Sequence, residues 1–169
     1  MPEWNIHNKW AEKLGISIQV SNYVNCLIDS PEKCPGFLDF AADRDNWLDF
    51  YKRTHSSWPY KANLKSLRSD SHLFRKLLWI EHDAGRGRSN KTATYIQLKF
   101  MRHKGSEYVK AWYLHHALDY VEKLAAAYPI EEILSRLEER TKTCPELEAV
   151  KDLIRSNSTQ ILQDLESNS

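Results

Sequence analysis

Apolar residues recur along the chain at the three- and four-residue spacing of amphipathic helices, and the alternation typical of strands is nearly absent. The pattern therefore predicts an all-α protein. Gly, Pro and Ser residues mark the expected breaks between the helices. The predicted helices cover residues 4–14, 18–29, 37–51, 71–83, 92–103 and 106–128, followed by a C-terminal helical hairpin over 129–169.

The faces of these helices indicate which side chains enter the core. The first helix carries on one side Trp4, His7, Trp10, Ala11 and Leu14. Helix 106–128 is expected to use Ser106 as its capping residue and to end before Pro129. Its apolar face consists of Val109, Trp112, Tyr113, His116, Ala117, Tyr120, Val121 and Leu124. The hairpin has narrow apolar stripes between charges, which suit packing on the core or on a second copy in a homodimer.

Composition narrows the class of protein. A chain of 169 residues with 41% hydrophobic and 28% charged residues fits one globular core, here residues 1–128, with the hairpin 129–169 added to it. The chain contains no apolar run of about 20 residues and no signal-peptide pattern at its start. We therefore expect a cytoplasmic protein with no membrane partner. Cys26, Cys34 and Cys144 are an odd number without a Cys-x-x-Cys pair, so we expect reduced thiols.

Charge is distributed unevenly along the chain. Residues 51–110 carry 14 Lys and Arg against 4 Asp and Glu, whereas residues 1–50 carry 4 against 8 and residues 111–169 carry 6 against 11. A basic segment between two acidic ones either pairs with them inside the fold or faces an anion, and phosphate is the usual anion at such a density. The expected partner is thus a phosphate-containing small molecule or a nucleic acid.

Histidine and aspartate are the candidate chemical groups. Phosphate-loop, nucleophile-elbow and zincin motifs are all absent from the sequence. His82-Asp83 ends an apolar helix, and His115-His116 lies in the longest one. His115 and Asp119 are four residues apart and share a helix face, while His116 points about 100° away. Imidazole and carboxylate together are typical ligands of a divalent transition metal.

Three stretches resemble the HD-domain metal-dependent phosphohydrolases. They are residues 6–11 (IHNKWA), residues 77–86 (LLWIEHDAGR) and residues 112–119 (WYLHHALD). The resemblance covers roughly residues 4–124 and implies a helical bundle that binds one or two divalent ions, such as Mn, Fe, Ni, Zn or Mg, and hydrolyses a nucleotide or another phosphate ester.

The resemblance also implies roles for single residues. The implied metal ligands are His7, His82, Asp83 and Asp119, with His115 or His116 as a further ligand or a phosphate contact. Asp83 would in addition orient the attacking water and is the candidate catalytic residue. The cations that would neutralise the phosphate are Arg86, Arg88, Lys91 and Lys110.

The sequence departs from the family pattern in two places. His7 and His82 are 75 positions apart, which requires an insertion at about residues 31–70, and Glu81 replaces the apolar residue usual before the doublet. His55, 27 positions before His82, gives a more usual gap. We prefer His7 as the first ligand because it shares a face with Trp10, while His55 lies beside a Ser-Ser-Trp-Pro turn.

Structural alternatives remain open for the same residues. His7 fits a core histidine bonded to a backbone carbonyl, and His116 fits a packing residue in the aromatic stripe. The basic segment also interleaves aromatic residues, as in modules that stack nucleic-acid bases or bind a protein partner without catalysis. These aromatics are Tyr51, Trp58, Tyr60, Phe74, Tyr95 and Phe100. A metal analysis of the purified protein separates the hydrolase from the binding module.

Overall fold

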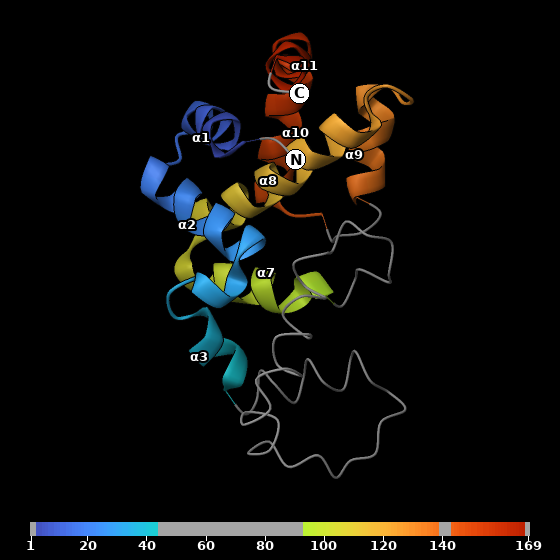
Figure 1. The fold of residues 1–169 in the computed structure, drawn as a ribbon. Helices are drawn as coiled ribbons and strands as arrows, with labels where there is room; N and C mark the ends of the chain where they lie inside the picture. The colour runs from blue at the N-terminus through green and yellow to red at the C-terminus, as the bar shows by residue number, and fades with distance from the viewer. Residues whose placement is uncertain (1–2, 44–92, 139–142, 168–169) are drawn as a thin grey trace. The chain divides into compact units, whose positions relative to one another are not determined.

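The structure is a computed structural model that describes residues 3–43, 93–138 and 143–167. All regular elements in these ranges are helical, so the predicted all-α class is confirmed (Figure 1). The helices are α1 (Trp4–Lys13), α2 (Ile18–Asp29), a short 3₁₀ turn (Pro31–Lys33), α3 (Phe37–Ala42), α7 (Ala93–Lys104), α8 (Ser106–Leu124), α9 (Ile130–Glu138), α10 (Pro145–Ser156) and α11 (Ser158–Glu166).

The chain forms two compact units, one of residues 1–25 and 104–169 and the other of residues 26–103. Helix α8 is the centre of the first unit, where it contacts α1, α9, α10 and α11. Because helices enclose it, α8 buries residues around most of its circumference. Its buried residues are Val109, Ala111, Trp112, Tyr113, Leu114, His115, Ala117, Leu118, Asp119 and Val121.

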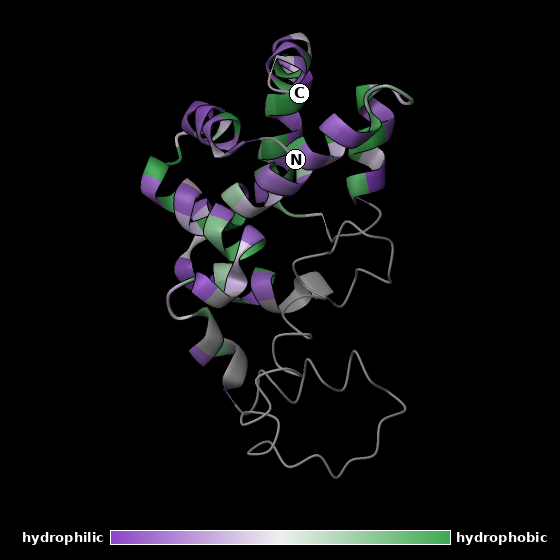
Figure 2. Ribbon diagram, in the orientation of Figure 1, coloured by the Kyte–Doolittle hydropathy of each residue, from purple (hydrophilic) through white to green (hydrophobic). Residues whose placement is uncertain are grey.

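The C-terminal helices bury narrow apolar stripes, as the sequence predicts. Within the described ranges, Figure 2 shows hydrophobic and hydrophilic residues alternating along single helices. The buried residues of α9, α10 and α11 include Ile133, Leu134, Leu137, Leu147, Val150, Ile154, Ile161 and Leu165. The second half of the predicted hairpin is divided into two helices at Asn157, whose Nδ2 donates to the Leu153 carbonyl at 2.8 Å. All three helices share the unit of α1 and α8.

Ion pairs link or support helices of this unit. Asp164 on α11 accepts hydrogen bonds from Lys9 Nζ at 2.6 Å and from the buried indole of Trp10 at 3.0 Å. Burial raises the pKa of Asp164, but the hydrogen bonds from Lys9 and other donors outweigh it and hold the pKa below its usual value. On α10, the buried Lys151 pairs with Glu138 and Glu148, each at 3.0 Å.

Aromatic packing organises the described part of the second unit. Phe100 on α7 contacts two rings of α3, with centroid distances of 5.5 Å to Phe37 and 4.9 Å to Phe40. Gly36 precedes α3 with a φ of 79°, and a Cβ there would lie 3.9 Å from Phe100. Glycine adopts this left-handed backbone without the steric cost that other residues pay. On α7, Gln97 Nε2 donates to the Leu27 carbonyl at 3.3 Å.

Several helix boundaries differ from the prediction. Helix α3 ends at Ala42, where Asp43 has an extended ψ of 139° and an aspartate is unfavourable at the negative end of a helix; the remainder of the predicted helix 37–51 lies outside the described residues. Helix α8 starts after Gly105, and Ser106 is not its cap, since its hydroxyl donates to Glu146 at 2.9 Å. The same helix ends at Leu124, and residues 125–128 form turns before Pro129.

In the described ranges, no helix combines the length and the apolar character needed to cross a bilayer.

Candidate metal centre

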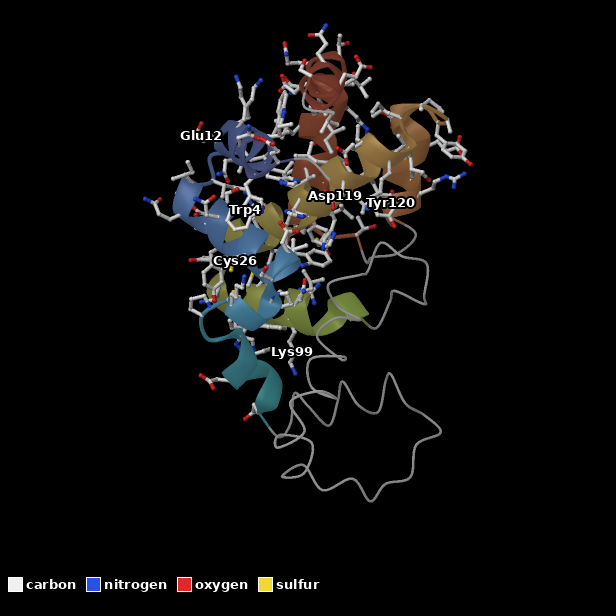
Figure 3. The ribbon with its side chains drawn as sticks, in the orientation of Figure 1. Trp4, Glu12, Cys26, Lys99, Asp119 and Tyr120 are labelled. Atoms are coloured by element: carbon white, nitrogen blue, oxygen red, sulfur yellow. The ribbon has the colours of Figure 1, made fainter. Side chains whose placement is uncertain are left out.

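Three buried side chains of the first unit converge on one point. His7 on α1 and His115 and Asp119 on α8 each offer a ligand atom, and these atoms lie within 4.8 Å of one another. Figure 3 labels Asp119 on the α8 ribbon. The three residues are nearly closed to solvent, with 2% of His7, 2% of His115 and 7% of Asp119 exposed. We call these three residues the His-His-Asp cluster.

Helical spacing explains how the cluster forms. His7 lies on the face of α1 that buries Trp10 and Ala11, and this helix packs against α8. His115 and Asp119 are four residues apart, so α8 alone brings their side chains to one face. The sequence predicted the shared face of α8 and the burial of His7, Trp10 and Ala11. Trp4, which was expected on the same face of α1, is 41% exposed.

The two imidazoles face one carboxylate. His7 Nε2 lies 3.5 Å from Asp119 Oδ1, and His115 Nε2 lies 3.8 Å from Asp119 Oδ2. The imidazole rings are stacked, with centroids 4.0 Å apart and planes inclined by 13°. Both Nε2 atoms therefore approach the same carboxylate from neighbouring positions.

These distances are too long for good hydrogen bonds, which need about 2.7–3.2 Å. Among the described residues, both ring nitrogens of His7 and the Oδ1 atom of Asp119 are buried and have no hydrogen-bond partner. Each such group costs about 1–3 kcal/mol in the folded state. The backbone carbonyl partner that a structural His7 would require is not found there. A cation held between the three side chains would offset that cost.

The separations fit ligands of a single ion. Metal bonds of about 2.0–2.2 Å at tetrahedral angles place two ligand atoms roughly 3.3 Å apart. The observed 3.5 Å and 3.8 Å exceed this by a few tenths of an ångström, within reach of small side-chain rotations. Three protein ligands would leave further coordination positions of the ion open.

A chain of asparagine side chains leads to His115. His115 Nδ1 lies 2.8 Å from Asn25 Oδ1, and both residues are buried. Asn25 Nδ2 donates to Asn8 Oδ1 at 3.3 Å, and Asn8 Nδ2 donates to Asn22 Oδ1 at 2.8 Å. The sequence analysis did not single out these asparagines. The available signal was Asn8 directly after His7 and Asn22 and Asn25 three residues apart on the next predicted helix.

His116 lies next to the cluster on a neighbouring face of α8. Its ring is 4.2 Å from the Trp112 ring, in the aromatic stripe where the sequence placed it. The side chain is half-buried overall, but its Nε2 atom is enclosed and has no hydrogen-bond partner among the described residues. Burial lowers the pKa of His116 from 6.5 to about 4; Asp119 acts in the opposite direction, and His7 and Lys123 lower it further. His116 is therefore neutral near pH 7.

The other predicted site residues are distributed differently. Lys110 lies on α8 and is half-buried. The doublet His82-Asp83, the alternative ligand His55 and the predicted phosphate contacts Arg86, Arg88 and Lys91 lie outside the described residues. Their predicted distances to the cluster, and the choice between His7 and His55 as first ligand, stay predictions.

No protein-family model, curated protein or solved structure matches the chain. The resemblance to HD-domain phosphohydrolases therefore remains a hypothesis that rests on the three sequence stretches.

Proposed function

We propose that the protein binds a divalent metal ion through His7, His115 and Asp119 and uses it to hydrolyse a phosphate ester. The observation that carries the proposal is the burial of three ligand atoms within 4.8 Å of one another. A core selected for stability alone would not keep two imidazoles and a carboxylate at distances that leave buried polar atoms unpaired. The resemblance to HD-domain enzymes and the basic segment 51–110 support the reaction class.

Different residues of the chain would bind the metal, orient the water and neutralise the phosphate. The cluster holds the ion, and a bound divalent ion supplies Lewis-acid chemistry, which polarises a phosphoryl oxygen and lowers the pKa of coordinated water toward about 7. His82 and Asp83 would complete the ligand set, and Asp83 would orient the attacking water. Arg86, Arg88, Lys91 and Lys110 would neutralise the phosphate.

The donor set favours certain metals. Imidazole nitrogen suits Zn, Fe and Ni, whereas Mg prefers oxygen ligands and near-octahedral geometry. Among the candidate metals, two histidines and one carboxylate therefore favour Fe, Ni or Zn over Mg and Mn. A nucleotide or another phosphate ester is the proposed substrate class.

Metal titration of the chelator-treated full-length protein tests the site. We expect about one equivalent of Zn²⁺ or Ni²⁺ to bind, as measured by calorimetry and elemental analysis. His7→Ala and Asp119→Asn should each weaken binding at least tenfold. His103→Ala is the matched control, because His103 is an exposed histidine of α7. Equal affinity in the wild type and the cluster variants would refute the proposed site.

Hydrolysis is a separate test. Phosphate release from a panel of nucleotides and simple phosphate esters should require added metal and should be lost in Asp83→Ala and Asp119→Asn. A protein that binds no metal and hydrolyses none of the panel would instead favour the binding module. That module would bind single-stranded oligonucleotides with an affinity that falls steeply as salt rises.

A further inference from the structure

The position of His7 depends on the helix that carries it and not on hydrogen bonds of its own ring. Both ring nitrogens are buried and have no hydrogen-bond partner among the described residues. The distance of 3.5 Å to Asp119 Oδ1 is too long for a good hydrogen bond. Helix α1 has 10 residues, and a helix of this length is marginal on its own in water. Whatever holds α1 in place therefore also places His7.

The three side chains directly after His7 are bonded to other helices. Asn8 Nδ2 donates to an asparagine of α2 at 2.8 Å. Lys9 Nζ and the indole nitrogen of Trp10 both donate to Oδ2 of Asp164 on α11, at 2.6 Å and 3.0 Å. Asp164 thus links the C-terminal helix to the helix of His7 by two hydrogen bonds to one oxygen.

The bond to Trp10 lies one helical turn from His7. The two residues are three positions apart and share a face of α1, and both are buried, with 2% of His7 and 1% of Trp10 exposed. An indole N–H can only donate, so at this depth it needs an acceptor such as Asp164 to avoid the cost of an unpaired buried group. The bond therefore fixes the rotation of α1 about its axis at the face that carries His7.

Asp164 is itself held in place on α11. Gln160, four residues earlier, donates to Oδ1 at 3.2 Å, while Oδ2 accepts the two bonds from α1. Burial alone would raise the pKa of Asp164, but the hydrogen bonds from Lys9 and other donors lower it below its usual value, so the group is charged near pH 7. Hydrogen bonds to a charged acceptor are about twice as strong as those between neutral groups.

We propose that Asp164 is a positioning residue that places His7 within reach of a metal ion through its bonds to Lys9 and Trp10. The metal part of this inference rests on the proposed function, whereas the placement of His7 does not. A binding group has to be held within about 0.5 Å of its productive position. A helix α1 released from Asp164 would hold His7 less closely, and the affinity of the site for the ion would fall.

The placement of His7 is tested in the metal-free protein by the proton chemical shifts of its ring. The ring is stacked on His115, with centroids 4.0 Å apart, and stacking moves ring signals upfield. We expect upfield shifts in the wild type and a move toward unstacked values in Asp164→Ala. Asp164→Asn should keep most of the shift, because its amide oxygen still accepts from the indole. Equal His7 shifts in the wild type and a folded Asp164→Ala protein would overturn the inference, whether or not the protein binds metal.

Zn²⁺ affinity, measured by calorimetry at a temperature where each variant is folded, tests the effect on the site. Asp164→Ala should weaken binding about tenfold, the lower end of the losses seen when a residue that orients a metal ligand is removed. Asp164→Asn should weaken it less. Ile161→Val is the matched control, because it removes buried packing from the same helix and leaves the bonds of Asp164 in place. Its affinity and its His7 shifts should equal those of the wild type.

The outcomes separate the two proposals. Failure of the wild type to bind Zn²⁺ or Ni²⁺ refutes the proposed metal site, while the His7 shifts still decide whether Asp164 places His7. Equal affinity in the wild type and a folded Asp164→Ala protein overturns the positioning role. Should Asp164→Ala fail to fold, Trp10→Phe takes its place, because it removes the indole donor and keeps an aromatic ring. Unchanged His7 shifts or unchanged affinity in that variant would overturn the inference.

Discussion

Replacing His7 with leucine is expected to abolish metal binding and to leave the metal-free protein slightly more stable than the wild type. Both ring nitrogens of His7 are buried without a hydrogen-bond partner in the described ranges. Such burial costs about 1–3 kcal/mol, and leucine avoids this cost. The variant loses the stacking on His115, where ring centroids are 4.0 Å apart, worth about 0.5–1.5 kcal/mol. The balance predicts a free energy of unfolding that rises by about 1 kcal/mol.

Thermal unfolding at pH 8 measures this balance, first with a chelator and then with Zn²⁺ or Ni²⁺. A gain of 1 kcal/mol corresponds to roughly 2–4 °C in Tm for a chain of this size. Free metal at one hundred times its Kd should stabilise the wild type by about 2.7 kcal/mol and the variant not at all. The order of stability should therefore reverse between the two conditions, with the variant more stable in chelator and the wild type more stable in metal.

A structural histidine would behave in the opposite way. If His7→Leu lowers the free energy of unfolding in chelator by more than about 1 kcal/mol and keeps the stabilisation by metal, His7 is a core residue and not a ligand. His103→Leu serves as the control, since His103 is exposed on α7. Its replacement should change the free energy of unfolding neither in chelator nor in metal.

Substitutions at three further positions test other parts of the first unit by chemical denaturation. Asp164→Ala should lower the free energy of unfolding by about 1–3 kcal/mol, because it leaves the buried Trp10 indole without its acceptor; Asp164→Asn, which keeps an acceptor, should cost less, and equal losses would contradict this. Lys151→Ala should lower the free energy of unfolding by about 1–2 kcal/mol, because the packing of its buried stem is lost. Lys151→Met should leave stability nearly unchanged, because both glutamate partners are partly exposed. A large loss of stability in the methionine variant would show that the charge of Lys151 stabilises the fold. The pKa of His116 is lowered to about 4, so the unfolded chain takes up the proton first and stability should fall by up to about 3 kcal/mol as the pH drops from 6.5 to 4. His116→Phe should flatten that slope, and an unchanged slope would exclude His116 as its source.

The sequence predicts which helix faces carry the cluster residues better than it predicts the asparagines that surround them. His7 lies on an apolar face with Trp10, and His115 and Asp119 share a face by their spacing, so local periodicity suffices for each helix. That α1 packs on α8 is a tertiary fact, which the resemblance to a known family implied and periodicity alone did not. The pairing of His7 with Asp119 illustrates this limit, because 112 positions separate the two residues in the chain.

The asparagine chain shows why the rest could not be predicted. In a sequence, Asn8, Asn22 and Asn25 have the character of solvent-facing or capping residues, since isolated asparagines are usually exposed. Asn25 is nevertheless buried, because it meets a partner from a helix that lies 90 positions later. A polar residue is buried when another element completes its hydrogen bonds, and this condition cannot be evaluated from one helix alone.

Helix α8 departs from its predicted one-sided stripe for a related reason. Leu114, Leu118 and Asp119 lie outside that stripe, yet they are buried because α1, α9, α10 and α11 all contact α8. A helix enclosed by several neighbours can place apolar residues on every side, so periodicity underestimates its burial. The enclosed position also buries the Oδ1 atom of Asp119, which has no hydrogen-bond partner among the described residues.

The cluster is asymmetric, and this asymmetry determines how it would take up an ion. His115 and Asp119 come from one helix turn, and Asn25 orients the His115 ring, so this pair is arranged before any ion binds. His7 comes from α1, and its outer nitrogen has no partner in the described part of the chain. In the proposed metal site, the α8 pair would need less rearrangement than His7 to hold an ion, and a bound ion would add a link between α1 and α8. A metal that binds only the folded state stabilises that state. The unpaired His7 nitrogens and Asp119 Oδ1, which destabilise the metal-free protein, are thus among the atoms through which a metal would stabilise it.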